Sequence, residues 1–156
     1  MQTILMPIDF SDTTDQVVAF VAGLAAPLDA EVYVLYVSQA DLDDSEQGKA
    51  ALSPRVDGIV AQLSEKGCVA SPLLVFGPVV ESILDQIDTK QPGMVVMGSH
   101  GHGALYDLVM GSVAGAIMRS GKCPVLIVPS PKPASWEPDP AMIDPDAWNE
   151  YGFPFG

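Results

Sequence analysis

Residues 93–129, GMVVMGSHGHGALYDLVMGSVAGAIMRSGKCPVLIVP, decide the fold of this chain. The apolar run GMVVMG (93–98) is typical of a parallel strand that is covered on both faces, and a second run, CPVLIVP (123–129), ends the stretch. Between them, SVAGAIMRS (112–120) has the apolar spacing of a helix and is followed by Gly121, a residue type that commonly ends helices. The stretch therefore predicts a strand, a glycine-rich loop, a helix and a strand.

The sequence before residue 93 repeats this alternation three times. Short apolar runs predict strands at 3–8, 31–37 and 69–76, the last at a sheet edge because Pro72 cannot donate a hydrogen bond to a neighbouring strand. Each run is followed by apolar residues at helical spacing. These stripes are Val17, Phe20, Val21 and Leu24; then Val56, Ile59, Val60 and Leu63; then Val80, Ile83, Leu84 and Ile87.

The ends of these helices also have sequence signals. Ser11 and Asp12 are expected to cap the first helix, and Pro78 suits the first turn of the third. Five strands alternating with four helices predict an α/β fold over residues 1–129: a single doubly wound, five-stranded parallel sheet with helices on both faces, of Rossmann-like class. In such sheets ligands bind beyond the carboxyl ends of the strands, where the winding reverses.

A proline-rich C-terminal extension, residues 130–156, has a different composition. Regular structure is not expected there, yet it contains five of the eleven aromatic residues. Two hypotheses stay open: a disordered tail, or an extended arm over its own domain or a partner subunit, anchored by the aromatics. These aromatics are Trp136, Trp148, Tyr151, Phe153 and Phe155.

Composition restricts the partners and the compartment. A formal charge of −13 disfavours binding to nucleic acid and to anionic membranes. No apolar run approaches the ~20 residues of a membrane span, and the first residues do not resemble a secretory signal, so a cytoplasmic location is expected. Cys68 and Cys123 are expected to be buried as small apolar side chains, without redox or metal chemistry.

Several familiar sites do not fit the chain. DFSDTT stands where a dinucleotide-binding fold has G-x-G-x-x-G, and GAIMRSGKC has neither the spacing nor the hydroxyl residue of a P-loop. A receiver-type phosphorylation switch has an aspartate after its third strand and a lysine after its fifth, where this chain has Phe76 and Pro129. Ser99 and Ser112 lie near histidines, but no G-x-S-x-G motif is present, which disfavours a Ser-His hydrolase.

The remaining motif is G-x-x-G-x9-G-S, formed by Gly98, Gly101, Gly111 and Ser112. It resembles the nucleotide-binding branch of the universal stress protein family, in which this motif follows the fourth strand. The resemblance extends over residues 1–129. It is supported by PIDFS (7–11), VLYV (34–37), FGPVVESIL (76–84) and GKCPVLIVP (121–129).

The motif has a direct physical reading. Gly98 and Gly101 allow the backbone to turn and approach a ligand where a Cβ would collide. Gly111 and Ser112 open a helix, whose free N–H groups and positive dipole end attract phosphate. Leu105, Leu108 and Val109 are expected to hold the loop against the core.

The resemblance implies an adenine-nucleotide site, for ATP or for AMP or ADP. It implies that the backbone around Ile8 and Val37 holds the base, and that Asp9 contacts the ribose or a nucleotide-bound Mg²⁺ or Mn²⁺. Met97 and Gly98 would line the ribose side. The implied binding residues are Pro7, Ile8, Asp9, Val37, Met97, Gly98, His100, Gly101, Gly111, Ser112 and Val113.

Simpler roles stay open for some of these residues. Asp9 is also consistent with a polar strand end or a helix cap, Ser112 with an N-cap, and the glycines with tight turns. His100 and His102 are typical of a loop surface. The nine-residue stretch HGALYDLVM lacks the basic residue that related sequences often carry, and it adds Asp107.

No residue is expected to be catalytic, so slow ATP hydrolysis is the most that the chain would support. Strand 123–129, if it is a sheet edge, predicts a homodimer paired through Val125, Leu126, Ile127 and Val128. The resemblance implies, as the favoured function, a stress-response sensor or regulator that binds adenine nucleotide. The alternative is a dimeric interaction module of the same fold without functional nucleotide binding, and a nucleotide hydrolase ranks third.

Overall fold

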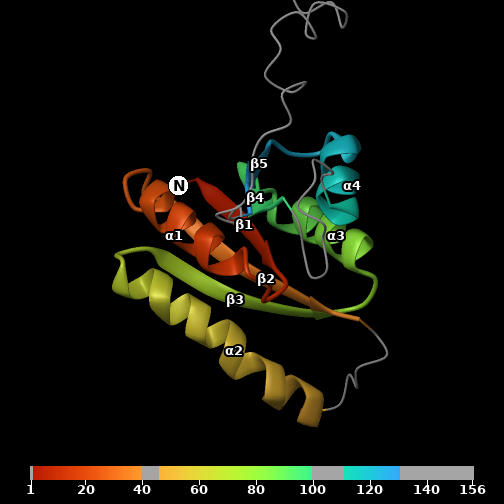
Figure 1. Ribbon diagram of the computed structural model, residues 1–156, viewed down its shortest axis with the longest axis horizontal. Helices are drawn as coiled ribbons and strands as arrows, with labels where there is room; N and C mark the ends of the chain where they lie inside the picture. The colour runs from red at the N-terminus through yellow and green to blue at the C-terminus, as the bar shows by residue number, and fades with distance from the viewer. Residues whose placement is uncertain (1, 40–45, 100–110, 131–156) are drawn as a thin grey trace, which may run out of the picture.

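The computed structural model describes residues 2–39, 46–99 and 111–130 (Figure 1). Within them five strands and four helices alternate in the expected order. The strands are β1 (Thr3–Ile8), β2 (Glu31–Ser38), β3 (Val69–Phe76), β4 (Met94–Gly98) and β5 (Val125–Val128). The helices are α1 (Thr14–Ala25), α2 (Glu46–Glu65), α3 (Val79–Lys90) and α4 (Ser112–Ser120).

The strands form one parallel sheet in the order β3-β2-β1-β4-β5. In the register of the central strand, Ile4 lies between Val32 of β2 and Met94 of β4. The chain winds outward from β1 to β3 and then returns to β4 on the other side, so the winding reverses between β1 and β4. The predicted doubly wound fold is confirmed, with β5 at one edge and β3, which contains Pro72, at the other.

Two helices cover each face of the sheet (Figure 1). Side chains alternate along β1: Ile4 and Met6 pack beneath α1 and α2, and Leu5 packs on the α3 and α4 side. These three side chains are at most 1% exposed. Both faces of the central strands are therefore core, which explains why their sequences are continuous apolar runs.

The helix starts differ from those expected. α1 begins at Thr14 with Thr13 as N-cap residue, so Ser11 and Asp12 are not its caps. The reason is a turn after β1, in which Phe10 has a φ of 57° and the Thr14 N–H donates to the Ser11 carbonyl. Pro78 is the N-cap residue of α3, one position before its first turn.

Helices α1 and α2 also differ from the stripes expected for them. Phe20 was expected in the buried stripe of α1 but is 43% exposed, because the helix turns Val17, Val18 and Val21 toward the sheet. α2 begins at Glu46, well before its predicted stripe, and contains Pro54.

The two cysteines are free thiols. Cys68 is buried, as expected, and Cys123 is half-buried. In the described part of the chain no helix combines the length and apolar character that a membrane span requires.

Candidate functional site

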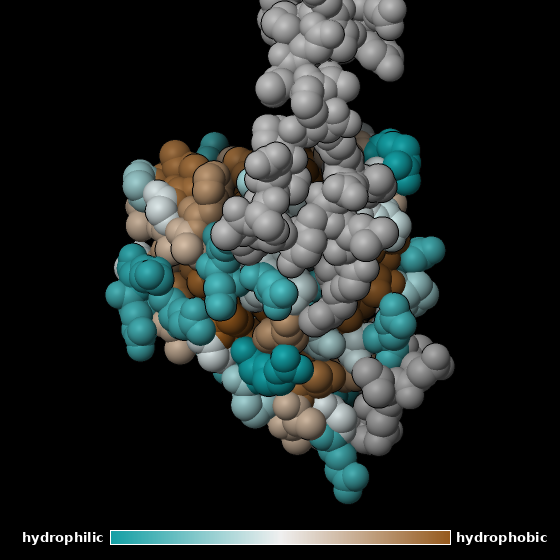
Figure 2. All heavy atoms as spheres, in the orientation of Figure 1, coloured by the Kyte–Doolittle hydropathy of each residue, from teal (hydrophilic) through white to brown (hydrophobic). Residues whose placement is uncertain are grey.

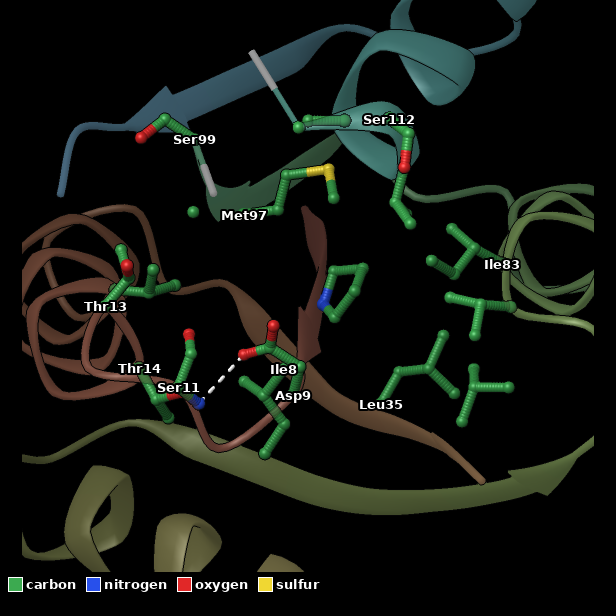
Figure 3. A pocket seen from close by; sticks show the side chains of 18 of the residues that line it. Ile8, Asp9, Ser11, Thr13, Thr14, Leu35, Ile83, Met97, Ser99 and Ser112 are labelled. Atoms are coloured by element: carbon green, nitrogen blue, oxygen red, sulfur yellow. Dashed lines mark hydrogen bonds between the residues drawn. The ribbon is translucent and has the colours of Figure 1, made fainter. Parts of the chain in front are cut away.

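A cavity of about 500 Å³ opens at the carboxyl ends of β1 and β4, where the winding of the sheet reverses (Figure 3). The end of β2 and the first turns of α1, α3 and α4 complete its walls. This is the position at which open α/β sheets bind ligands, because the connections after β1 and β4 lead to helices on opposite faces and leave a crevice between them. The cavity volume is within the range of small-molecule sites.

Nine of the residues predicted from the sequence line this cavity. They come from three strands and one helix N-terminus that are far apart in the chain. They are Pro7, Ile8, Asp9, Val37, Met97, Gly98, Gly111, Ser112 and Val113. His100 and Gly101, and with them His102, Leu105, Asp107, Leu108 and Val109, lie outside the described residues.

One side of the cavity is apolar. Leu35 and Val37 of β2 face Val79 and Ile83 of α3, and Val113 of α4 lies near them. Figure 3 shows Leu35 and Ile83 on this side, away from α1. A flat aromatic group of a ligand would find van der Waals contacts here without having to desolvate charged groups.

The opposite side, toward α1, carries hydroxyl groups. Ser11 and Thr13 belong to the turn before α1, Thr14 begins the helix, and Ser99 follows β4 (Figure 3). Thr13 Oγ1 lies 2.9 Å from Ser130 Oγ, which lies 3.4 Å from Ser99 Oγ. These contacts join the start of α1 to the ends of β4 and β5.

Asp9 lies at the mouth of the cavity, between these two sides, and is exposed. Its Oδ1 accepts a hydrogen bond of 2.9 Å from the Ser11 N–H, which fixes the carboxylate at the strand end. The next residue, Phe10, is held by the Tyr36 ring at 4.9 Å and by the Arg55 guanidinium at 4.0 Å from its ring centroid. Asp9 therefore acts as a polar residue at the end of β1, as one of the simpler expectations had it. It also lines the cavity.

The start of α4 presents backbone donors to the cavity. Gly111 is the N-cap residue, with φ −53° and ψ 150°, and no side chain caps the helix. Ser112 is the first helical residue, so its alternative role as the N-cap is wrong. The Gly111 N–H donates to the Ser99 carbonyl at 2.8 Å, while the N–H groups that follow it have no acceptor within the helix itself. Such an N-terminus attracts anions.

Ten lining residues were not predicted. They are Ser11, Thr13, Thr14, Val17, Leu35, Gln39, Val79, Ile83, Ser99 and Ala114. For Ser11, Gln39, Val79 and Ser99 a signal existed, since each follows a strand or begins a helix at the carboxyl edge of the sheet. Leu35 lies in an expected strand and Ile83 in an expected helical stripe, and only the tertiary structure shows that a cavity opens beside them.

Thr14 has an unusual environment among these residues. It is 6% exposed, and its Oγ1 is buried without a hydrogen-bond partner among the described residues. Burying a hydroxyl without a partner costs about 1–3 kcal/mol. The α1 side of the cavity thus includes a polar atom that is not satisfied within the described structure.

The described lining contains one acidic side chain, Asp9, and no basic one. Among the described residues no group of three or more His, Cys, Asp or Glu gathers to hold a metal ion. Burial, with the charge and hydrogen bond of Glu31, raises the pKa of the Tyr33 phenol, and burial raises the pKa of the Cys123 thiol. Neither Tyr33 nor Cys123 is among the described residues that line the cavity.

Solved structures share this fold. The structure of MJ0577 from Methanocaldococcus jannaschii matches with a TM-score of 0.70 at 24% identity, covering 85% of this chain and 98% of that one. A universal stress protein from Archaeoglobus fulgidus in complex with dAMP has a TM-score of 0.66 at 19% identity, covering 81% and 97%. Two others, at TM-scores of 0.68 and 0.63, were solved with cAMP and with AMP.

Sequence comparison points to the same group of proteins. Universal stress protein MJ0531 of Methanocaldococcus jannaschii is 27% identical over 144 residues, covering 83% of this chain and 82% of that protein. The model of the universal stress protein family matches residues 1–129. The chain therefore belongs to the universal stress protein family.

Proposed function

We propose that the cavity at the β1–β4 switch point binds an adenine nucleotide. The observation that carries this proposal is the division of the cavity into an apolar side, formed by β2 and α3, and a side of hydroxyl groups and helix-start amides. A nucleotide has the same division, with an apolar base at one end and a polar sugar and phosphates at the other. Complexes of structural relatives with cAMP, dAMP and AMP support this assignment.

The same division supports one proposed orientation of the ligand. The base lies between Val37 and Ile83, the ribose lies over Ile8 and Asp9 beside Met97 and Gly98, and the phosphates reach the first amides of α4. Ser112, exposed at the start of that helix, adds a hydroxyl donor to these amides. His100 and Gly101 remain proposed phosphate contacts on the strength of the sequence motif alone.

The negative charge of the protein favours a nucleotide with few phosphates, or one that binds together with a cation. No basic side chain is among the described lining residues, and the chain has a net charge of −13. ATP would therefore require a divalent ion such as Mg²⁺ or Mn²⁺, to which Asp9 offers one carboxylate ligand beside phosphate oxygens and water. AMP and ADP place less charge in the site, and we propose that they bind as well.

The proposed role is that of a stress-response sensor or regulator in the cytoplasm, whose nucleotide occupancy changes its affinity for partners. The described lining contains no basic side chain to stabilise charge in phosphoryl transfer, so we expect any hydrolysis to be slow. Among the described strands β5 pairs only with β4, and we propose that Val125–Val128 pairs through its other edge with a second copy to form a homodimer.

Two measurements test the nucleotide proposal. Mass spectrometry of small molecules released from the purified protein is expected to detect an adenine nucleotide. Calorimetric titration with ATP, ADP and AMP, with and without Mg²⁺, is expected to show saturable heat. No heat from any adenine nucleotide in protein free of bound ligand would exclude the proposal.

The alternative function is a dimeric interaction module without functional nucleotide binding. The lack of a basic side chain in the described lining favours this alternative. It predicts a dimer by light scattering together with no bound nucleotide and no heat of titration, whereas the favoured function predicts binding. A monomer at micromolar concentration would contradict this alternative and the proposed homodimer, but not nucleotide binding.

A further inference from the structure

The outer face of α1 is apolar and open to solvent. Phe20 and Leu28 are each 43% exposed, and Leu24 between them is half-buried. Because residues four apart lie on the same side of a helix, they form a row that continues into the turn after α1. We call this row the α1 stripe. Figure 2 shows brown and tan atoms gathered over the C-terminal half of α1, at the upper left.

The α1 stripe is also free of charge. No Asp, Glu, Lys or Arg occurs between residues 16 and 28, in a chain with 27 such residues in total, 20 acidic and 7 basic. A helix at the surface normally carries charged residues on its outer face, and one that is apolar all round is normally covered. An uncharged apolar row of this kind is suited to contact with another segment or molecule.

We propose that residues 131–156 of the same chain dock on the α1 stripe. The described chain ends at Ser130, and this end is attached beside α1. Ser130 Oγ lies 2.9 Å from Oγ1 of Thr13, the N-cap residue of α1, and the Ser130 N–H donates to Ser99 Oγ at 3.1 Å. The C-terminal segment thus starts at the N-terminal end of the helix that carries the stripe.

The segment is long enough to cover the stripe. Phe20 lies about 10 Å along the helix axis from Thr13, and Leu28 about 22 Å, at about 1.5 Å per residue. An extended chain covers about 3.1–3.3 Å per residue, so Trp136 reaches as far as about 20 Å from Ser130. Pro131 and Pro133 favour such an extended conformation.

The chemistry of the segment also fits this surface. It carries five aromatic residues, each of which buries about 150–250 Å² when it is covered. It also carries five acidic residues against one lysine, so most of this acidic protein repels it. The α1 stripe offers apolar contacts without a negative charge between residues 16 and 28. Docking there removes apolar side chains of both partners from water.

Tryptophan fluorescence of the full-length protein tests the proposal. The two tryptophans of the chain, Trp136 and Trp148, both lie in the segment, so the signal reports on it alone. We expect the native protein to show blue-shifted emission and weaker acrylamide quenching than the urea-unfolded chain. The double variant Phe20→Gln with Leu28→Gln is expected to shift emission to the red and to increase quenching.

Met118→Gln is the matched control. Met118 is also 43% exposed but lies on α4, on the other face of the sheet, so its substitution is expected to leave both signals unchanged. Circular dichroism and the melting temperature verify that each variant is folded. If the double variant does not fold, the native protein alone still tests the proposal. Acrylamide quenching of its tryptophans as strong as in the urea-unfolded chain would overturn the proposal.

Three other outcomes would overturn it. An unchanged tryptophan signal in a folded double variant would mean that the segment does not lie on the α1 stripe. A loss of dimer mass in that variant, without a change in fluorescence, would assign the stripe to a second copy. A native signal that is lost when the dimer dissociates on dilution would assign it to the segment of a partner subunit. None of these measurements requires nucleotide, so they are independent of the proposed function.

Discussion

Thr13 and Ser130 are hydrogen-bonded through their side chains, with 2.9 Å between Thr13 Oγ1 and Ser130 Oγ, although they are 117 residues apart in the chain. Thr13 is 4% exposed and lines the cavity, and Ser130 is the last described residue after β5. Ser99 approaches the same Ser130 hydroxyl, at 3.4 Å. The cavity wall and the exit of the C-terminal segment therefore share one hydroxyl cluster.

The contact between Thr13 and Ser130 predicts that substitutions at the two positions have non-additive effects on stability. Thr13→Val and Ser130→Ala are each expected to lower the free energy of unfolding, and the double variant is expected to lose less than the sum. The coupling expected for one hydrogen bond between neutral groups is about 1 kcal/mol. Urea unfolding of the four proteins measures it. Strict additivity within error would mean that the contact does not contribute to stability.

Gly111→Val is expected to weaken nucleotide binding at least tenfold without unfolding the protein. The φ and ψ of Gly111 are accessible to any L-residue, so the substitution introduces bulk into the cavity without backbone strain. Calorimetry measures the affinity. Gly58→Ala on α2 is the control, because a Cβ there meets no atom within 4 Å. It is expected to bind normally and to gain about 0.5–1 kcal/mol of stability.

Thr14→Val is expected to stabilise the nucleotide-free protein by about 1 kcal/mol, because it removes a buried hydroxyl that has no partner in the described structure. Valine has nearly the same shape and is also β-branched. The control is Thr89→Val in α3, where the hydroxyl donates to the Asp85 carbonyl at 2.7 Å and no gain is expected. Urea denaturation compares the variants. Destabilisation by Thr14→Val would show that this hydroxyl is satisfied in solution.

Thiol labelling is expected to be slow at neutral pH. Burial raises the pKa of the Cys123 thiol, so less thiolate is present at pH 8 than in a free cysteine, and only the thiolate reacts. The labelling rate is expected to increase with pH to a midpoint above the ordinary cysteine value. Cys68 is 6% exposed and is expected to react only after unfolding. Iodoacetamide labelling followed by mass spectrometry measures the rates at Cys123 and Cys68. The variant Cys123→Ser is the control, in which only Cys68 can be labelled. Labelling of native Cys123 as fast as free cysteine at pH 8 would contradict this expectation.

The sequence by itself determined the order and type of the strands and helices. Continuous apolar runs such as TILMPI, alternating with helical stripes, are typical of a parallel sheet that is covered on both faces. It also determined that residues following β1 and β4 lie together at one edge of the sheet, because parallel strands end at a common edge. That is why nine of the predicted residues, among them Asp9 and Gly111, line one cavity.

Only the tertiary structure decided which side of each element faces that cavity and which faces solvent. Every residue of α1 from Val17 to Ala25 is apolar or glycine, so the sequence does not reveal that Phe20 turns outward. Leu35 and Ile83 have the pattern of core residues, and only the packing of α3 against β2 leaves an opening beside them. The Thr13, Ser99 and Ser130 cluster depends on the strand order, which brings the ends of β4 and β5 to the start of α1. Local sequence patterns encode propensity and burial, whereas contacts between distant segments depend on how the whole chain packs.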